Sequence, residues 1–163
     1  MATNTLLQCL NEGSDFGVTA SNRRQVEVYI AAETVAEKDA VSLDLAQSVD
    51  GDKALKIRKA DTGTATDKAF VGVVLKSAEP DGSLDAGARI FVVVAGPVEA
   101  NVDAATVAGS LLQIGSTAGR LAVRETSVDE GGSDTFDLFP IAAIAAEADT
   151  SNVATVFVYK QFA

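Results

Sequence analysis

Apolar and polar residues alternate with a period of two along most of the chain from Gln25 onward, and β-branched residues are enriched there. Residues that favour turns recur between these segments at intervals of about 8 to 12 positions, which is typical of a β-barrel or a β-sandwich. We therefore predict an all-β fold. The predicted strands are 25–31, 40–45, 54–59, 70–77, 89–95, 97–101, 111–114, 120–124, 139–146 and 154–159.

One predicted strand has a competing interpretation. The alanine-rich segment 140–148 has helical propensity, but Pro140 and the turn residues at 149–152 bound it closely. A strand is the prediction there, and the sequence predicts no long helix.

The chain has 163 residues, of which 47% are hydrophobic, so it can bury one core or two small lobes that share a core. A weak duplication relates residues 26–79 to residues 89–148. Its clearest match is a Leu-x-[IV]-Arg pattern, found at Leu55–Arg58 and again at Leu121–Arg124. Spacings differ between the copies, so chance similarity is the alternative to a pair of small β-barrel or β-sandwich modules.

The first 24 residues differ in character from the rest. They mix apolar and turn residues without a sustained period, which predicts an extended N-terminal arm followed by a β-rich core over 25–163. The terminus has no basic segment followed by an apolar run of signal-peptide length, so we expect no secretion signal.

Composition argues against several classes of function. The chain has no histidine and one cysteine, Cys9, which excludes an internal disulfide, histidine-dependent catalysis and the usual zinc or haem sites. Cys9 is expected to pack as a small apolar residue. A net charge of −10 disfavours nucleic acid as a partner, and the longest apolar run, 90–98, is too short to span a membrane.

Two segments resemble ligand sites only superficially. The stretch "VAGSLLQIGSTAGRL" (107–121) lacks the lysine and the glycine spacing of a phosphate-binding loop, so we predict two short strands joined by tight turns. The acidic segment near 125–137 does not have the spacing of a calcium loop, and a solvated loop is favoured over calcium binding. Its candidate ligands would be Asp129, Glu130, Asp134 and Asp137. No cofactor and no metal are predicted.

Residues 65–160 resemble the capsid decoration, or cement, proteins of tailed bacteriophages. The similarity is carried by a "VGVxL" strand, an Asp/Gly-rich turn, a "V-x-V-x-x-x-G-x-V" strand, and a "V-x-x-G-[DS]-L-L" and "S-T-A-G-x-L" pair. These motifs lie at Val71–Leu75, Asp81–Gly87, Val92–Val98, Val107–Leu112 and Ser116–Leu121. Gly109-Ser110 stands where Gly-Asp is more usual, and serine also stabilises turns.

The resemblance implies a non-enzymatic protein on the outer surface of a virion, made in the host cytoplasm, that clamps neighbouring major capsid protein subunits. It also implies self-association, as a homotrimer or, next in order, a dimer. Exposed strand edges and an arm suit such a clamp, and acidity suits a surface that faces away from DNA.

Two groups of residues are candidates for capsid contact. The first group belongs to the arm: Leu6, Leu7, Leu10, Phe16, Arg23 and Arg24. Its apolar members are equally expected to pack back on the barrel. The second group is a locally basic stretch that includes Lys53, Lys56, Arg58 and Lys59. A solvated strand face is the alternative for this stretch, and it is favoured over a docking surface.

Two other classes of function remain as alternatives. One is a receptor-binding or glycan-binding module displayed on a viral particle, although only 6% of the residues are aromatic. The other is a small hydrolase, for which the chain offers no recognisable catalytic motif.

Overall fold

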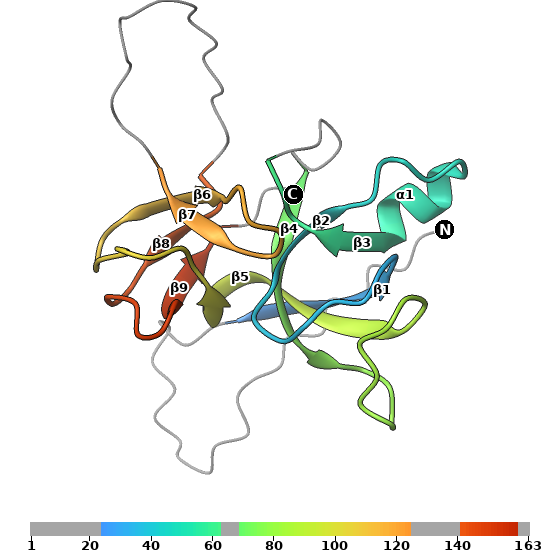
Figure 1. Ribbon diagram of the computed structural model, residues 1–163. Coiled ribbons are helices and arrows are strands. Elements are labelled where there is room, and N and C mark those ends of the chain that lie inside the picture. Colours follow the sequence, from blue (N-terminus) through green and yellow to red (C-terminus); the bar gives the residue numbers. More distant parts are fainter. Residues whose placement is uncertain (1–23, 63–68, 125–140, 160–163) are drawn as a thin grey trace, which may run out of the picture.

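A computed structural model of the chain describes residues 24–62, 69–124 and 141–159. The described residues form a mixed sheet with one short helix, so the predicted all-β fold is confirmed (Figure 1). The elements are β1 (Gln25–Ala31), β2 (Ala40–Leu43), α1 (Asp50–Leu55), β3 (Lys56–Lys59), β4 (Phe70–Ser77), β5 (Arg89–Asn101), β6 (Leu111–Ile114), β7 (Leu121–Val123), β8 (Ala143–Ala145) and β9 (Val153–Val158).

The first module is a closed ring of five strands. Its order is β1-β3-β2-β4-β5, and β5 also pairs antiparallel with β1. The closing contact between β1 and β3 is parallel and short, with Ile30 opposite Lys56 and Ala31 opposite Ile57. A ring of this kind leaves few strand edges open.

The second module repeats this pairing scheme with the remaining strands. The C-terminal part of β5 pairs with β9, then β8, β6 and β7 follow in order. A parallel bridge between Val102 and Leu121 closes this ring, as the pair Ala31 and Ile57 does in the first. Equivalent residues of the two bridges are separated by constant distances in the sequence: Val102 follows Ala31 by 71 positions, and Leu121 follows Ile57 by 64 positions.

The same two separations apply throughout both modules. Val41 lies opposite Lys59 in the first, and Leu112 lies opposite Val123 in the second. The pairing therefore matches Leu121 with Ile57, whereas the Leu-x-[IV]-Arg pattern aligned it with Leu55. The sequence alignment fails because the β2–β3 connection, from 43 to 57, is seven residues longer than the β6–β7 connection, from 114 to 121.

β5 belongs to both modules. The sequence predicted two strands here, 89–95 and 97–101, but the structure has one strand from Arg89 to Asn101. Gly96 and Pro97 resemble a strand break, yet Gly96 adopts a φ of 98° and the strand continues through it. Residues before Gly96 pair in the first module, and residues from Gly96 onward pair in the second.

The helix α1 was not predicted, since residues 54–59 were predicted as one strand. Residues 50–55 are helical instead, and only 56–59 form a strand. Asp50 and Asp52 lie in the first helical turn, and Asp50 pairs with Lys53. No residue of α1 is buried, so its sequence has no apolar stripe from which a helix is recognisable.

Each module has its own core, built from corresponding positions. The core of the first module consists of Ala31, Val35, Val41, Ile57, Val71, Val74, Ile90, Val92 and Val94. Shifted by 71 or 64 residues, these positions become Val102, Thr106, Leu112, Leu121, Ala142, Ala145, Ala154, Val156 and Val158, and all nine are buried. The burial pattern thus repeats together with the strand pairing.

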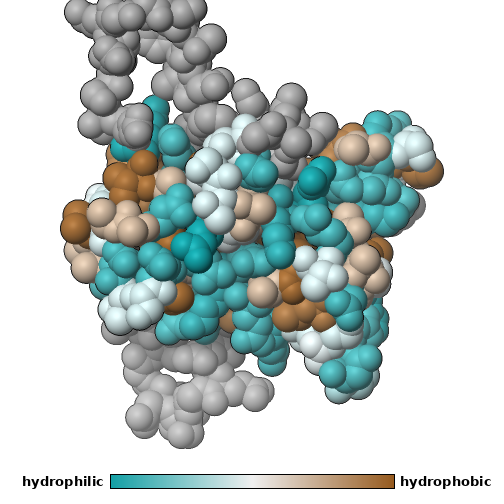
Figure 2. Space-filling view, viewed as in Figure 1, coloured by the Kyte–Doolittle hydropathy of each residue, from teal (hydrophilic) through white to brown (hydrophobic). Residues whose placement is uncertain are grey.

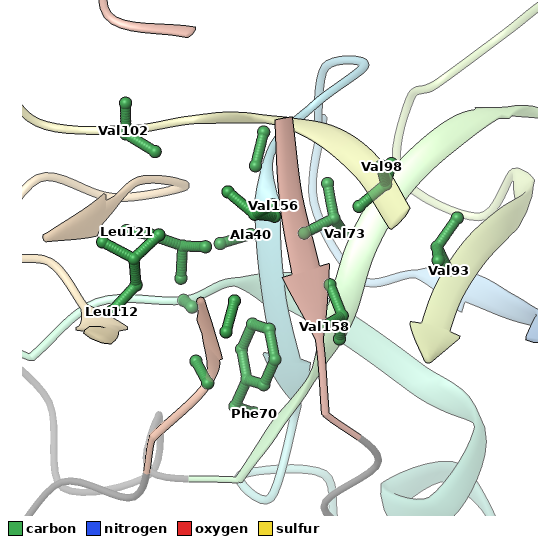
Figure 3. Close-up of a cluster of buried hydrophobic side chains, with 14 of the residues drawn as sticks. Ala40, Phe70, Val73, Val93, Val98, Val102, Leu112, Leu121, Val156 and Val158 are labelled. Atoms are coloured by element: carbon green, nitrogen blue, oxygen red, sulfur yellow. The ribbon is translucent and has the colours of Figure 1, made fainter. Parts of the chain in front are cut away.

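The two modules are joined by a further buried layer. Val26, Val93, Val73 and Ala40 lie opposite one another in consecutive strands, on the outside of the first ring. We call these four residues the inner row. They are at most 4% exposed, because they belong to the core cluster of the second module. Figure 3 shows Ala40, Val73 and Phe70 among Val156, Val158 and Leu112.

Backbone hydrogen bonds reinforce this layer. The N–H of Ala40 donates to the carbonyl of Gly119, and the N–H of Gly119 donates to the carbonyl of Ala60. The β6–β7 turn of the second module is therefore fixed against β2 of the first.

Candidate contact surfaces

The predicted arm lies almost wholly outside the described residues. Arg24, which directly precedes β1, is its only described member and is partly exposed. Leu6, Leu7, Leu10, Phe16 and Arg23 lie outside the described residues, as do Cys9 and the candidate calcium ligands Asp129, Glu130, Asp134 and Asp137. Their predicted roles stay predictions.

The predicted basic stretch does not form a continuous row of free cations. Lys53 Nζ lies 2.9 Å from Asp50 Oδ1, and Lys56 Nζ lies 3.1 Å from Asp52 Oδ2. Both lysines therefore have acidic partners within the β2–β3 connection. Such exposed pairs contribute little to stability, and their charges remain open to competition from a binding partner.

The other two basic candidates lie on β3 and are partly buried. Arg58 stands opposite Ser42 in the β2–β3 ladder. Lys59 donates its backbone N–H to Glu33 Oε1 over 2.8 Å, and its Nζ lies 3.8 Å from Asp39 Oδ2. Lys59 thus lies near the junction between the modules, where Asp39 is located.

Asp39 occupies the centre of that junction, and the sequence analysis missed it. Its side chain is 9% exposed and accepts hydrogen bonds from the Ala36 backbone and from Asn101 Nδ2, both over 2.9 Å. Lys38 adds an ion pair of 2.7 Å with Glu99. These contacts bind the β1–β2 connection to β5, so the geometry of Asp39 is that of a structural joint.

β1 presents an open edge. Only Ile30 and Ala31 pair with β3, so in the described part of the chain residues 25–29 have a paired strand on the β5 side alone. The backbone of Ala31 faces the β5 side, where it exchanges hydrogen bonds with Ala88 and Gly87. Alternation along a strand directs the backbone groups of Val28 to the open side, and the Val28 side chain is 44% exposed.

Polar side chains follow the same strand. Gln25 Nε2 and the Tyr29 hydroxyl each donate to the Glu27 carboxylate over 2.8 Å. Partial burial, the hydrogen bond and the negative charge of Glu27 all raise the pKa of Tyr29, burial most of all. This network fixes three side chains along β1 next to the open edge.

Eight large apolar side chains are exposed among the described residues, and they divide evenly between the modules. Val28, Leu45, Val49 and Leu55 lie in the first, and Val107, Val123, Phe157 and Tyr159 lie in the second. In Figure 2, apolar atoms reach the surface at the end that carries α1 and again over the second module. Clustered exposed apolar residues are typical of surfaces that bind other proteins.

We call Leu45, Val49 and Leu55 the α1 surface, because all three belong to the β2–β3 connection. They are 43%, 58% and 51% exposed. The corresponding β6–β7 turn of the second module is seven residues shorter and contains no large apolar residue. Sequence reasoning missed the surface because single apolar residues between turn residues do not reveal their exposure.

No group of three or more metal-ligating side chains gathers within residues 24–62, 69–124 and 141–159. Nor is any helix of this part of the chain long and apolar enough to cross a membrane. A scan against protein-family models finds no matching family, and a search of curated proteins finds no relative.

Proposed function

We propose that this chain is a non-enzymatic structural protein of a phage virion, which binds the outer surface of the capsid and cements neighbouring major capsid protein subunits. The resemblance of residues 65–160 to phage decoration proteins motivates the proposal. The observation that carries it is the open edge of β1 on an otherwise closed ring. Such an edge accepts a strand from another protein through main-chain hydrogen bonds.

The edge is suited to this role by its place in the fold. β1 is held by β5 along six of its residues, from Val26 to Ile30 and at Gln25, so it is a rigid template. It begins directly after Arg24, where the predicted arm joins the barrel. An arm and a strand edge that meet at one point can contact two neighbouring subunits.

Binding to undecorated phage heads tests the proposal. Purified full-length protein is co-sedimented with heads at two salt concentrations, and saturable binding is expected. Val28→Pro removes the backbone N–H at the open edge and is expected to weaken binding at least tenfold, whereas Val28→Thr retains the N–H and is the matched control. Circular dichroism verifies that both variants fold. Absence of saturable binding by the unmodified protein would refute the proposal.

One observation favours a second candidate function. Phe157 and Tyr159 are two residues apart at the end of β9, and their side chains are 41% and 45% exposed. Exposed aromatic rings stack on sugars, so a displayed glycan-binding module is the alternative. A glycan array probed with the full-length protein and with Phe157→Ala distinguishes the two: hits that the substitution abolishes would favour glycan binding.

A further inference from the structure

The outside of the second module carries a row of residues that corresponds to the inner row. Pro97 lies opposite Phe157, Phe157 opposite Ile144, and Ile144 opposite Leu111. In the first module the same pairings join Val26 to Val93, Val93 to Val73, and Val73 to Ala40. We call Pro97, Phe157, Ile144 and Leu111 the outer row. Directly opposed residues share one face of a sheet, so each row is a continuous apolar band.

The two rows differ in what covers them. The inner row is buried under the second module, whereas every residue of the outer row is partly or largely exposed. Its central residue, Phe157, is the larger counterpart of the fully buried Val93. The described residues therefore repeat the apolar band that joins the two modules, but they include no third module that covers the second copy of the band.

The internal joint indicates which element fits such a band. At the inner row, the covering element includes the β6–β7 turn, fixed by the hydrogen bonds between Gly119, Ala40 and Ala60. The counterpart of this turn in the first module is the β2–β3 connection, and Leu55 is the position that corresponds to Gly119. That connection carries the α1 surface, whose three apolar residues all remain exposed.

Charge is also complementary. Arg124, the counterpart of Ala60, flanks the outer row, where its N–H donates to the carbonyl of Leu111. On α1, the side chain of Asp50 is 95% exposed although it pairs with Lys53. The outer row therefore has a basic residue beside it in the chain, and the α1 surface has an exposed acidic one.

We propose that the outer row binds the α1 surface of a second copy of this chain, which gives a head-to-tail contact between the second module of one copy and the first module of the next. The two surfaces lie on different modules, so the contact is heterologous, and an open assembly retains one free outer row at one end and one free α1 surface at the other until a ring closes. This self-association does not depend on the proposed capsid role.

The sedimentation velocity of the full-length protein over a concentration series tests the contact. The unmodified protein is expected to exceed the 16.7 kDa mass of one chain, and Phe157→Glu and Leu55→Glu are each expected to reduce it to one chain. Ala86→Glu adds the same charge at an exposed residue outside both surfaces and is the control. If Phe157→Glu lowers the thermal stability, Phe157→Gln replaces it.

Mixing the two variants gives the decisive result. Each variant retains one intact surface, so an equimolar mixture of Phe157→Glu and Leu55→Glu is expected to form dimers and nothing larger. Three results would overturn the proposal: an unmodified protein that is monomeric at every concentration, association that survives Leu55→Glu, or a mixture that stays monomeric. Association that survives Leu55→Glu but not Phe157→Glu would show that outer rows bind one another instead.

Discussion

Asp39 in the first module accepts a hydrogen bond from the Asn101 side chain in the second, 62 residues later in the chain and 2.9 Å away. The carboxylate is almost fully buried, and its other oxygen accepts the N–H of Ala36. This pair fixes the β1–β2 connection against the shared strand, where the second module begins.

Replacing Asp39 or Asn101 by alanine is expected to lower the free energy of unfolding by about 1 to 3 kcal/mol, since each change leaves a buried or partly buried polar partner without its hydrogen bond. A double-mutant cycle measured by urea unfolding gives their coupling energy. Thr34 and Asp85, which share an exposed hydrogen bond of 3.1 Å, are the control pair, with a coupling energy near zero expected. Equal coupling in both pairs would contradict this role of Asp39.

Gly119→Ala is expected to destabilise the protein more than Gly82→Ala. Both glycines have positive φ, 80° and 75°, so each substitution incurs a backbone cost of about 1 kcal/mol. A Cβ on Gly119 would also lie 2.8 Å from Asp39 Oδ1, whereas a Cβ on Gly82 would have nothing within 4 Å. Thermal melts of the two variants measure the difference, and equal melting temperatures would show that the junction tolerates the added methyl group.

Stability is expected to decline at alkaline pH through Tyr29. Its pKa in the folded protein lies above the ordinary value of 10.0, so above that pH the unfolded chain loses this proton while the folded chain retains it. The contribution is complete below pH 10.0 and is lost as pH rises toward the folded-state pKa. Tyr29→Phe removes the ionisable group and should flatten the pH dependence of the free energy of unfolding.

Tyrosinate absorbance provides a direct check on the same residue. The chain has two tyrosines, and a Tyr159→Phe background leaves Tyr29 as the only one. A titration midpoint at or below 10.0 in the folded protein would show that neither burial nor Glu27 acts as described.

Shortening the β2–β3 connection is expected to leave the fold intact. Replacing residues 44–56 by the six residues GSTAGR of the β6–β7 connection restores the length that the second module uses. Because α1 buries no residue and Asp44 is the only buried residue of the replaced segment, a single cooperative melt with a small change in midpoint is expected. Calorimetry measures it, and loss of the cooperative transition would show that α1 contributes to the core. The same variant should also lose the proposed self-association.

Local patterns predicted most of the strands. The bounds of β1, β4 and β6 match the sequence prediction, because each of these strands alternates clearly and ends at turn residues. The described part of the alanine-rich segment forms β8 and not a helix, since the pairing of β8 with both β6 and β9 outweighs alanine propensity there.

Features that depend on contacts between residues distant in the sequence could not be predicted from local patterns. Strand β5 was divided in two because Gly96 and Pro97 look the same whether a strand ends or passes from one ring to another. The duplication was aligned two residues out of register at Leu55, since a helix without buried residues occupies the longer connection. The inner row and the outer row have similar apolar character, and only the three-dimensional arrangement reveals that one is covered and the other exposed.

The shared strand has a mechanical consequence. β5 is a strand of both rings. A force applied to one module is therefore transmitted through the continuous backbone at Gly96 to the hydrogen-bonded strands of the other. No flexible linker is present at this point to absorb the load. The two rings should therefore unfold together under tension, at a single rupture force. Two domains joined by a flexible linker would instead show two rupture forces.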